Sequence, residues 1–320
     1  MDIIRPTELL DAMLTSSNVA ETSPATSPLE WSSATAYVVD DEVSVTYTTA
    51  GASIATHLIY TCNLAHTNKD PTLTANQGYD TDGTTGLGWN ITDATNRWRA
   101  FNNVIQQATT NANTIEYEIT AGEQTTAIAF FGLDAQTVTV TVTDPTDGVI
   151  YNEEFSVISD SGITDWYLYF TEEIVREQKL IVFGLPAFYA AAVIYIVIDD
   201  TGATPAVGEI VFGNQFNIGA SQYGATFTIT DYSVKATAED GAITISQGAY
   251  SNLADINVVI DTPRFDHIKN TLTEIRSTPI VWVADQNSAE TMLFGYYRNF
   301  RIQLGDYVTS RTLLQIEGLI

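Results

Sequence analysis

The sequence is poor in the residues that build covalent cross-links and most metal sites. Cys62 is the single cysteine among 320 residues, and histidine occurs only at His57, His66 and His267. One cysteine excludes an intrachain disulfide framework and a cysteine-based zinc site. No two histidines stand at the spacing of a metal-binding pair. We therefore expect no resident metal.

Recognisable catalytic motifs are also missing. The chain has no Gly-x-Ser-x-Gly nucleophile elbow, no phosphate-binding loop and no dinucleotide fingerprint. Acidic clusters at residues 40–42, 80–83 and 199–200 offer the oxygen ligands that Ca²⁺ prefers, but none fits the twelve-residue calcium loop, and solvated turns explain them better. Carboxylates are so abundant that a glycosidase-like pair would carry no weight. We expect neither enzyme activity nor a cofactor.

Positive charge and long apolar runs are scarce. Thirteen Lys and Arg against 39 Asp and Glu give a net charge of −26 with no basic run, which argues against a nucleic-acid partner. Residues 180–198 are uncharged, but Gly184 and Pro186 interrupt them, so two buried strands are expected instead of membrane insertion. The first residues lack the apolar segment of a signal peptide, so none is expected.

What the chain does contain favours β-structure. It is 45% hydrophobic and only 16% charged, and Thr, Ser, Asn, Val and Ile fill much of the rest. The fold class is therefore predicted to be mainly β, with enough residues for two or three domains. We divide the chain into residues 1–28, a terminal arm; 29–98, a small aromatic-rich β module; 99–222, a β-sandwich; and 223–320, a β domain with one helix.

The terminal domain has the clearest pattern. Short alternating segments predict strands at residues 226–230, 242–246, 257–260, 280–283, 291–296 and 312–316. Residues 261–263 supply a polar cap and a proline for the first turn of a helix. Its apolar stripe consists of Phe265, Ile268, Leu272 and Ile275. One helix against such a sheet leaves strand edges free.

Charge divides the chain unevenly. Residues 225–320 hold 7 basic and 11 acidic side chains, a net of −4, so the preceding residues hold the other 6 basic and 28 acidic, a net of −22. A nearly neutral domain can pack against copies of itself or a scaffold without self-repulsion, while the acidic part faces water. The alternative is an ordinary folded domain that touches nothing.

Residues 1–28 are predicted to form an arm. Residues 6–14 can make about two turns of helix, with Leu10, Met13 and Leu14 as its apolar face. The following Ser-, Thr- and Pro-rich stretch, residues 16–28, has no apolar period and should be extended or mobile. A short apolar helix on such a tether would dock on its own domain or on a neighbour.

Residues 29–98 are bounded by tryptophans. A Trp, a Tyr six residues on, a Tyr-x-Cys strand at residues 60–62, a His-Thr pair at residues 66–67 and a final Trp make this unit resemble the small chitin- and cellulose-binding modules of chitinases. It departs from them at Asp40, in an insertion at residues 47–56, and in the loop 79–88. The resemblance implies that aromatic faces stack on sugar rings. The candidate residues are Trp31, Tyr37, Tyr60 and Trp89, which would otherwise form the core of a unit this small.

Residues 99–222 carry a series of strand-like segments. They lie at residues 114–119, 127–133, 137–142, 148–151, 166–170, 179–183, 192–198 and 208–213. The segment 127–133 is apolar on both faces, as a central strand would be. This order resembles the galactose-binding-like jelly roll, a fold that hosts many functions.

Taken whole, the chain is similar to structural tail proteins of tailed bacteriophages. The segments that carry this are residues 96–101, 128–133, 219–224, 295–300 and 314–319. The resemblance implies a virion protein of the tail or baseplate, assembled in the host cytoplasm, with other phage tail proteins as partners. Its terminal domain, similar to tail-tube and distal-tail proteins, would form a homo-oligomer ring. The alternative is an adhesion protein that binds a host-surface glycan through residues 29–98 or the jelly roll.

Overall fold

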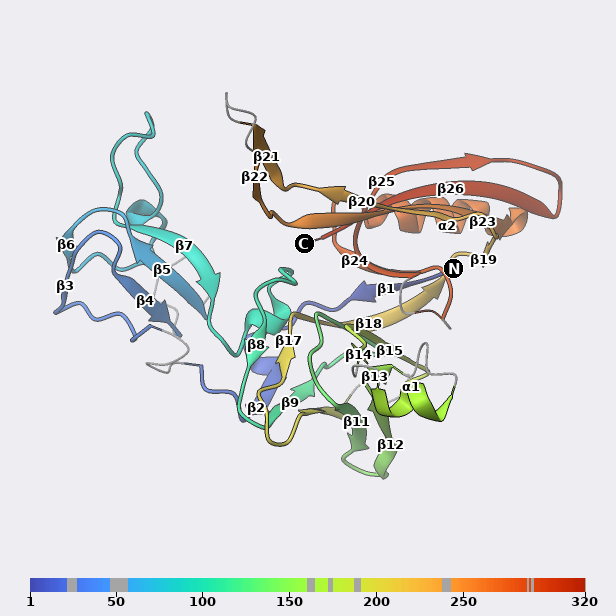
Figure 1. Cartoon of the computed structure of the whole chain (residues 1–320), viewed down its shortest axis with the longest axis horizontal. Helices are drawn as coiled ribbons and strands as arrows, with labels where there is room; N and C mark the ends of the chain where they lie inside the picture. The colour runs from blue at the N-terminus through green and yellow to red at the C-terminus, as the bar shows by residue number, and fades with distance from the viewer. Residues whose placement is uncertain are drawn as a thin grey trace.

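The computed structural model describes residues 1–21, 28–46, 57–159, 165–171, 175–186, 191–237, 243–286, 288 and 291–319. The predicted class is confirmed: the chain is mainly β, with a small module, a β-sandwich and a terminal β domain that carries one long helix (Figure 1). No helix in the described part is long and apolar enough to cross a membrane. The predicted insertion at residues 47–56 lies outside the described residues.

The small module is built from two sheets. Its three-stranded sheet has the order β4-β5-β7 and consists of β4 (Glu42–Val45), β5 (Leu58–Cys62) and β7 (Trp89–Ala94). A second pair consists of β3 (Ala36–Tyr37) and β6 (His66–Thr67). A 3-10 turn, η2 (Thr74–Asn76), lies in the long connection to β7. The core between these strands is small and mainly aromatic.

A ten-stranded sheet runs through the rest of the molecule. Its order is β15-β10-β18-β1-β24-β25-β26-β23-β19, and β20 pairs with β23 beside that path. The strands are β1 (Asp2–Pro6), β10 (Ala127–Phe131), β15 (Lys179–Phe183), β18 (Glu209–Asn217), β19 (Ala220–Ser221), β20 (Thr226–Asp231), β23 (Tyr250–Asp261), β24 (Ile280–Val283), β25 (Met292–Gln303) and β26 (Thr309–Gly318). Sandwich and terminal domain therefore share one sheet.

A five-stranded sheet completes the sandwich. It has the order β12-β11-β16-β9-β2 and consists of β2 (Leu14–Ser17), β9 (Thr114–Thr120), β11 (Thr137–Asp144), β12 (Gly148–Ser156) and β16 (Val193–Asp199). Alternate residues of β9 point inward, so Tyr117 is fully buried with Phe130 of β10 and Phe212 of β18. Strand β10 is buried along its whole length, as its sequence predicts.

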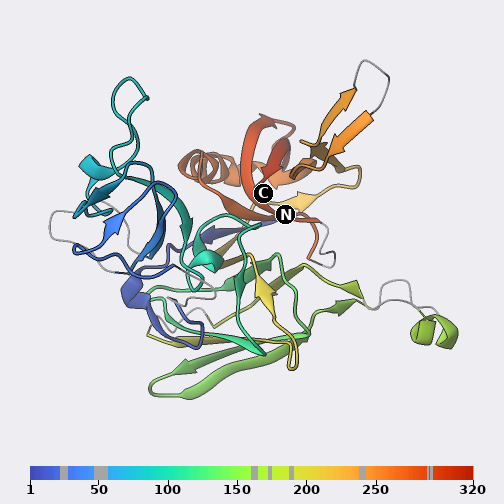
Figure 2. The same cartoon turned by 60° about the vertical axis from the view of Figure 1, so that its left-hand side comes forward.

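Several short strand pairs and 3-10 turns lie outside the two large sheets. The pairs are β8 (Thr109–Thr110) with β17 (Ala206–Val207), β13 (Ile158–Ser159) with β14 (Val175–Arg176), and β21 (Val234–Thr237) with β22 (Ile243–Ser246). The 3-10 turns are η1 (Asp11–Met13), η3 (Arg99–Phe101) and η4 (Thr262–Arg264). Figure 2 shows the β21–β22 hairpin extending away from the terminal sheet.

The terminal helix α2 (Phe265–Glu274) lies where its sequence predicts it. Ile268, Leu272 and Ile275 are buried, and they pack with Trp282 and Leu314 of the sheet beneath. Phe265 is partly buried at the start of the stripe. The period of about 3.6 residues thus places one apolar face against one face of the sheet.

The segment 166–170 is a correction to the prediction. It forms a short helix, α1 (Trp166–Thr171), and not a strand. Trp166, Tyr167 and Phe170 are at least three-quarters exposed, and Figure 2 shows α1 standing away from both sheets. A strand needs a neighbour to pair its backbone groups, whereas a helix pairs them within itself. Aromatic residues are enriched in strands, so the composition of this segment predicted a strand where the structure has a helix.

The predicted arm is wrong as well. Strand β1 lies between β18 and β24 (Figure 1). Ile3 and Ile4 are fully buried on its two faces. Residues 6–14 hold only the single turn η1, after which β2 pairs with β9. The apolar residues of this stretch serve the fold, since Leu14 packs against the sandwich core. The two remaining arm residues are Met13, half-buried, and Leu10, which is 53% exposed.

Candidate functional site

The four aromatic residues proposed to stack on sugar lie in or against the core of the small module. Tyr60 and Trp89 have no exposed surface, and Tyr37 is 7% exposed. The Tyr37 and Trp89 rings meet edge to face at 5.0 Å, and the Trp89 indole N–H donates to the Lys69 carbonyl at 2.8 Å. A covered ring offers no face to a ligand, so the stacking role of Tyr37, Tyr60 and Trp89 is wrong. Trp31 is partly buried against the same cluster.

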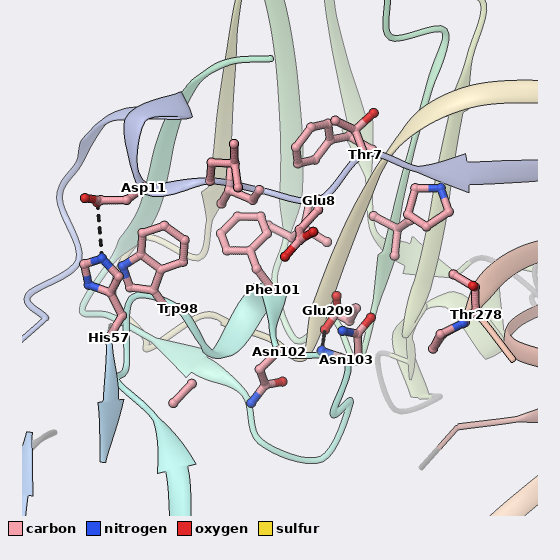
Figure 3. A pocket seen from close by; sticks show the side chains of 18 of the residues that line it. Thr7, Glu8, Asp11, His57, Trp98, Phe101, Asn102, Asn103, Glu209 and Thr278 are labelled. Atoms are coloured by element: carbon pink, nitrogen blue, oxygen red, sulfur yellow. Dashed lines mark hydrogen bonds and ion pairs between the residues drawn. The ribbon is translucent and has the colours of Figure 1, made fainter. Parts of the chain in front are cut away.

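A cavity lies in the molecule away from the aromatic core of the small module. This cavity of about 760 Å³ lies between residues 6–11, the start of β5, the η3 turn and the start of β18. Figure 3 shows Phe101 and Glu8 in the middle of this cavity, with the His57–Trp98 pair at one end. Its volume falls within the range of small-molecule sites, about 300–1,000 Å³. The lining residues come from the N-terminal segment, the module and the sandwich, with Thr278 and Pro279 of the terminal domain at one side.

Two aromatic side chains are brought to the cavity by the link between module and sandwich. This link consists of residues 95–98, which follow β7, and the η3 turn. Phe101 is half-buried at the end of the turn, where it meets Trp98 at 6.3 Å and Tyr117 at 5.2 Å, both edge to face. Trp98 stacks on the His57 ring at 4.3 Å with the planes 16° apart. The aromatic wall is therefore held from both sides.

Glu209 forms the deep polar wall of the cavity. Its side chain is 4% exposed, and its Oε2 accepts a hydrogen bond of 2.8 Å from the Asn103 backbone N–H. Burial removes water from the carboxylate and raises the pKa of Glu209 to about 9, although the Asn103 N–H partly opposes this. At neutral pH Glu209 is therefore an uncharged acid that both donates and accepts hydrogen bonds.

Close backbone approach explains how Asn103 reaches Glu209. Gly208 lies against the loop that follows η3, and a Cβ added there would lie 2.2 Å from the Ile105 carbonyl oxygen. Asn103 has a φ of 62°, in the left-handed region that asparagine tolerates better than most residues. The glycine and the turn together press the loop onto the start of β18.

The cavity is acidic at its rim. Glu8 and Asp11 are exposed there, and no lysine or arginine belongs to the described lining. Asp11 Oδ1 lies 3.2 Å from His57 Nε2. The other polar groups of the lining include the amides of Asn102 and Asn103, the hydroxyl groups of two threonines and the Trp98 indole N–H. An anionic ligand would find no lysine or arginine in this described lining.

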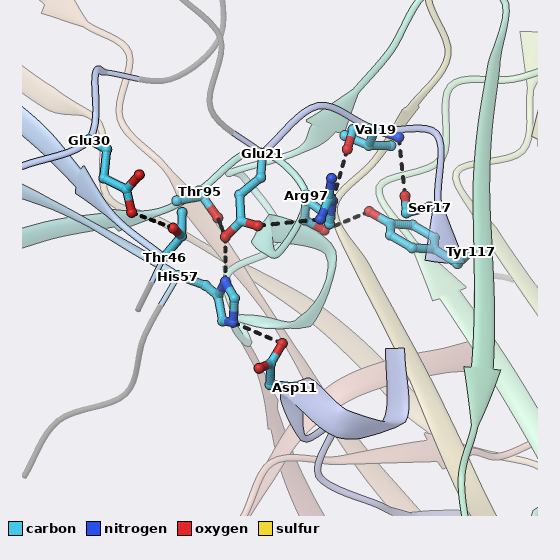
Figure 4. Close-up of polar contacts among 10 residues, drawn as sticks. All are labelled: Asp11, Ser17, Val19, Glu21, Glu30, Thr46, His57, Thr95, Arg97 and Tyr117. Carbon is cyan, nitrogen blue, oxygen red and sulfur yellow. Dashed lines mark hydrogen bonds and ion pairs between the residues drawn. The ribbon is translucent and has the colours of Figure 1, made fainter. Parts of the chain in front are cut away.

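A polar network fixes the module beside the cavity. His57 contacts Glu21 through Nδ1, and Glu21 also lies 3.3 Å from Arg97 and from the Thr95 hydroxyl (Figure 4). His57 itself has a φ of 67°, an uncommon backbone conformation for a side chain of this size. The network therefore determines where the His57–Trp98 wall stands.

The same network continues into the sandwich. Arg97 Nε donates to the Val19 carbonyl at 2.8 Å, and the Tyr117 hydroxyl donates to the Arg97 carbonyl at 2.7 Å (Figure 4). Sequence reasoning treated the histidines only as candidate metal ligands and missed this role. A lone histidine carries no local signal for carboxylate partners that lie 46 and 36 residues away in the chain.

Sequence reasoning missed the cavity too. The one local signal was Glu209, an acidic residue that opens the otherwise apolar strand segment 209–213. An acidic residue is almost never buried in such a strand unless it has a partner. The aromatic residues Trp98 and Phe101 gave no comparable sign, because they differ in nothing from core aromatics.

Exposed apolar side chains gather on the terminal domain at two places. The first is the β20–β22 extension, residues 226–237 and 243–246, where Phe227, Ile229, Val234 and Ile245 are 45–65% exposed. The second is the β25–β26 loop, residues 304–308, where Leu304, Tyr307 and Val308 are 63–91% exposed. Strand β20 pairs with the first half of β23, whereas the loop lies beyond its far end. Phe227 pairs with Ala254 and Thr309 pairs with Asp261, so about seven residues of β23, roughly 23 Å, separate the near end of the extension from the loop.

Comparison with known proteins does not assign this chain to a family. No family model matches the chain, and no curated protein matches it. A solved structure, a histidine mutant of the lectin binding domain of Lectinolysin complexed with Lewis b, is similar with 12% identity and a TM-score of 0.26, over 37% of this chain and 82% of that chain. A likeness of this size carries no argument about function.

Proposed function

We propose that the protein is a structural component of a bacteriophage tail or baseplate. In this proposal the terminal domain assembles with copies of itself into a ring, other tail proteins are its neighbours, and the acidic modules point outward. The observation that carries the proposal is the pair of exposed apolar surfaces on the terminal domain, the β20–β22 extension and the β25–β26 loop.

Strand β20 of the extension has exposed apolar side chains and, among the described strands, one unpaired edge. Five of the six residues of β20 are exposed, although a strand that packs on a core buries alternate residues. Phe227 and Ile229 share one face of β20 and are 45% and 63% exposed. Among the described strands, β20 has a partner on one side only, so its other edge can pair with another chain.

The position of the two surfaces favours a head-to-tail arrangement. A ring formed by rotation uses two different patches on each subunit, whereas a two-fold dimer uses one patch twice. The extension and the loop are different patches at opposite ends of β23. The net charge of −4 on residues 225–320 opposes their approach far less than the −22 on the preceding residues would.

Oligomeric state tests this directly. The full chain is expected to form a closed oligomer in light scattering coupled to size exclusion, and Ile229→Lys and Tyr307→Lys are each expected to give monomers with unchanged melting. Val149→Lys, a change at a residue 62% exposed on the sandwich, is the matched control and should leave the oligomer intact.

Mixing the two variants identifies the arrangement. In a head-to-tail ring each variant keeps the patch that the other has lost, so the mixture should yield dimers that grow no further. Dimers of Tyr307→Lys by itself would instead indicate two-fold pairing of the extension. A wild-type chain that stays monomeric across a concentration series, and virions that still contain a protein carrying Ile229→Lys, would count against a structural role.

The alternative function is adhesion through a glycan. Burial of Tyr37, Tyr60 and Trp89 argues against the module surface that first suggested it. The cavity between module and sandwich is a separate place for a sugar.

A further inference from the structure

We propose that the cavity lined by Trp98, Phe101, Asn103 and Glu209 is a binding site for a neutral saccharide, whose ring packs on Phe101 and whose hydroxyl groups bond to Glu209 and Asn103. This site is independent of the assembly of the terminal domain. It uses none of the four aromatic residues that the module's sequence singled out.

The aromatic wall matches one face of a sugar. A pyranose ring carries its C–H bonds on faces that pack on aromatic rings, in the manner of other apolar contacts. Phe101 is half-buried and lies in the middle of the cavity, so part of its ring faces the space (Figure 3). Its neighbours Trp98 and Tyr117 meet it edge to face and hold its orientation. The platform therefore exists before a ligand arrives.

The polar wall matches hydroxyl groups. Within the described residues, the Glu209 carboxyl makes one hydrogen bond, from the Asn103 N–H to Oε2, so its other oxygen retains bonding capacity. Asn103 is exposed, and its side chain is carried on a turn beside Glu209 (Figure 3). Adjacent carboxyl and amide groups can serve neighbouring hydroxyls as donors and acceptors.

Charge narrows the class of saccharide. The described lining contains no lysine or arginine, so a sialic or uronic acid would meet only Glu8, Asp11 and Glu209. An amine would meet the carboxylates Glu8 and Asp11 at the exposed rim, where water weakens the attraction, and would gain a buried anionic partner only if Glu209 were ionised. Burial keeps Glu209 protonated at neutral pH, because its pKa is raised to about 9. The deep end of the cavity is therefore uncharged, which favours a neutral saccharide over both ionic classes.

Saturation-transfer NMR on the full chain tests the class with matched probes. Glucose and glucuronate differ by one carboxylate, and N-acetylglucosamine and glucosamine differ by an acetyl group against an ammonium group. Glucose, galactose or N-acetylglucosamine is expected to bind, with both charged partners weaker by about tenfold or more. Binding of none of the three neutral sugars, or a preference for glucosamine or glucuronate, would overturn the proposal.

Variants place the binding in the cavity. Phe101→Ala should weaken it by about tenfold, and Asn103→Gly by roughly fivefold, since glycine keeps both the backbone N–H and the φ of 62°. Because Phe101 also packs on the core, a melting curve accompanies it, and Asn103→Gly decides the matter if Phe101→Ala unfolds. Tyr79→Ala, at an aromatic residue 51% exposed on the module, is the control and should change nothing.

Glu209→Gln separates a neutral ligand from a cation. Glutamine replaces the carboxyl O–H with an amide but stays an uncharged donor and acceptor, so affinity for the neutral sugar should fall by only about threefold. A cationic ligand would lose its partner, and its binding would fall by more than about tenfold. Loss of binding in Tyr79→Ala with unchanged binding in Asn103→Gly would move the site to the module and refute the cavity.

Discussion

Glu209 makes the stability of this protein depend on pH in a direction opposite to that of most carboxylates. Its pKa is 4.5 in an unfolded chain and about 9 in the fold, since burial disfavours the charged form. Between these values the unfolded state releases a proton that the folded state keeps. The contribution of Glu209 to stability is therefore fully present below about pH 4.5 and is lost as the pH rises toward 9.

The size of this loss in stability follows from the difference between the two pKa values of Glu209. Each pH unit between the two pKa values costs about 1.4 kcal/mol, so moving from pH 4.5 to pH 7 costs on the order of 3 kcal/mol. Glu209→Gln removes the titration and keeps an acceptor for the Asn103 N–H. We expect the variant to equal the wild type near pH 4.5 and to exceed it by about 3 kcal/mol in free energy of unfolding at pH 7.

Urea unfolding of wild type and variant at pH 5, 6, 7 and 8 measures this difference. Other carboxylates and the net charge of −26 also change stability with pH, but they act on both proteins and cancel in the difference. Glu154→Gln, at an exposed residue of β12, is the matched control and should show no such slope. A difference between Glu209→Gln and wild type that stays constant from pH 5 to pH 8 would refute the neutral acid and, with it, the uncharged wall of the cavity.

Three further substitutions test the fold around the site. Ile3→Ala should lower the free energy of unfolding by about 2–5 kcal/mol, because Ile3 is fully buried in the central sheet, and a loss below about 1 kcal/mol in urea unfolding would contradict that position. Trp89→Ala should cost about 3–5 kcal/mol within the module, so limited proteolysis should cut residues 29–98 first; a resistant module would speak against an aromatic core. Gly208→Ala places a Cβ 2.2 Å from the Ile105 carbonyl oxygen and should displace the loop from Glu209, so hydrogen exchange of the Asn103 amide should become faster. Unchanged exchange would show that the loop accommodates the added methyl group without losing the Asn103–Glu209 hydrogen bond.

Periodic segments were predictable from the sequence because their pattern repeats within a few residues. The stripe from Phe265 to Ile275 gives α2, and the unbroken apolar segment of β10 gives a strand covered on both faces. Strand β1 has only two apolar residues in its buried half, Ile3 and Ile4, and its partners β18 and β24 lie more than 200 residues away. No pattern in the neighbouring sequence distinguishes such a strand from a terminal segment that packs on nothing.

The cavity illustrates the same limit. Its walls come from residues 6–11, 57–58, 94, 98, 101–103, 209–212 and 278–279, and pairing of β1 with β18 brings residues 6–11 beside residues 209–212. Composition indicated aromatic residues in the module, but it does not distinguish rings that fill a core from rings that border a space. The exposed β20–β22 extension was foreseen only as a sheet with free edges, without the residues that occupy them.

The insertion of β1 between β18 and β24 also sets an order of events during synthesis. Asp2 pairs with Asn217 and with Val283, so β1 can close the central sheet only after about 280 further residues have been synthesised. Until then one edge of β18 is open to the wrong partner, and contacts this distant in sequence form slowly. Completion of the fold is thus a late event, and a nascent chain halted before residue 280 would lack the means to finish it.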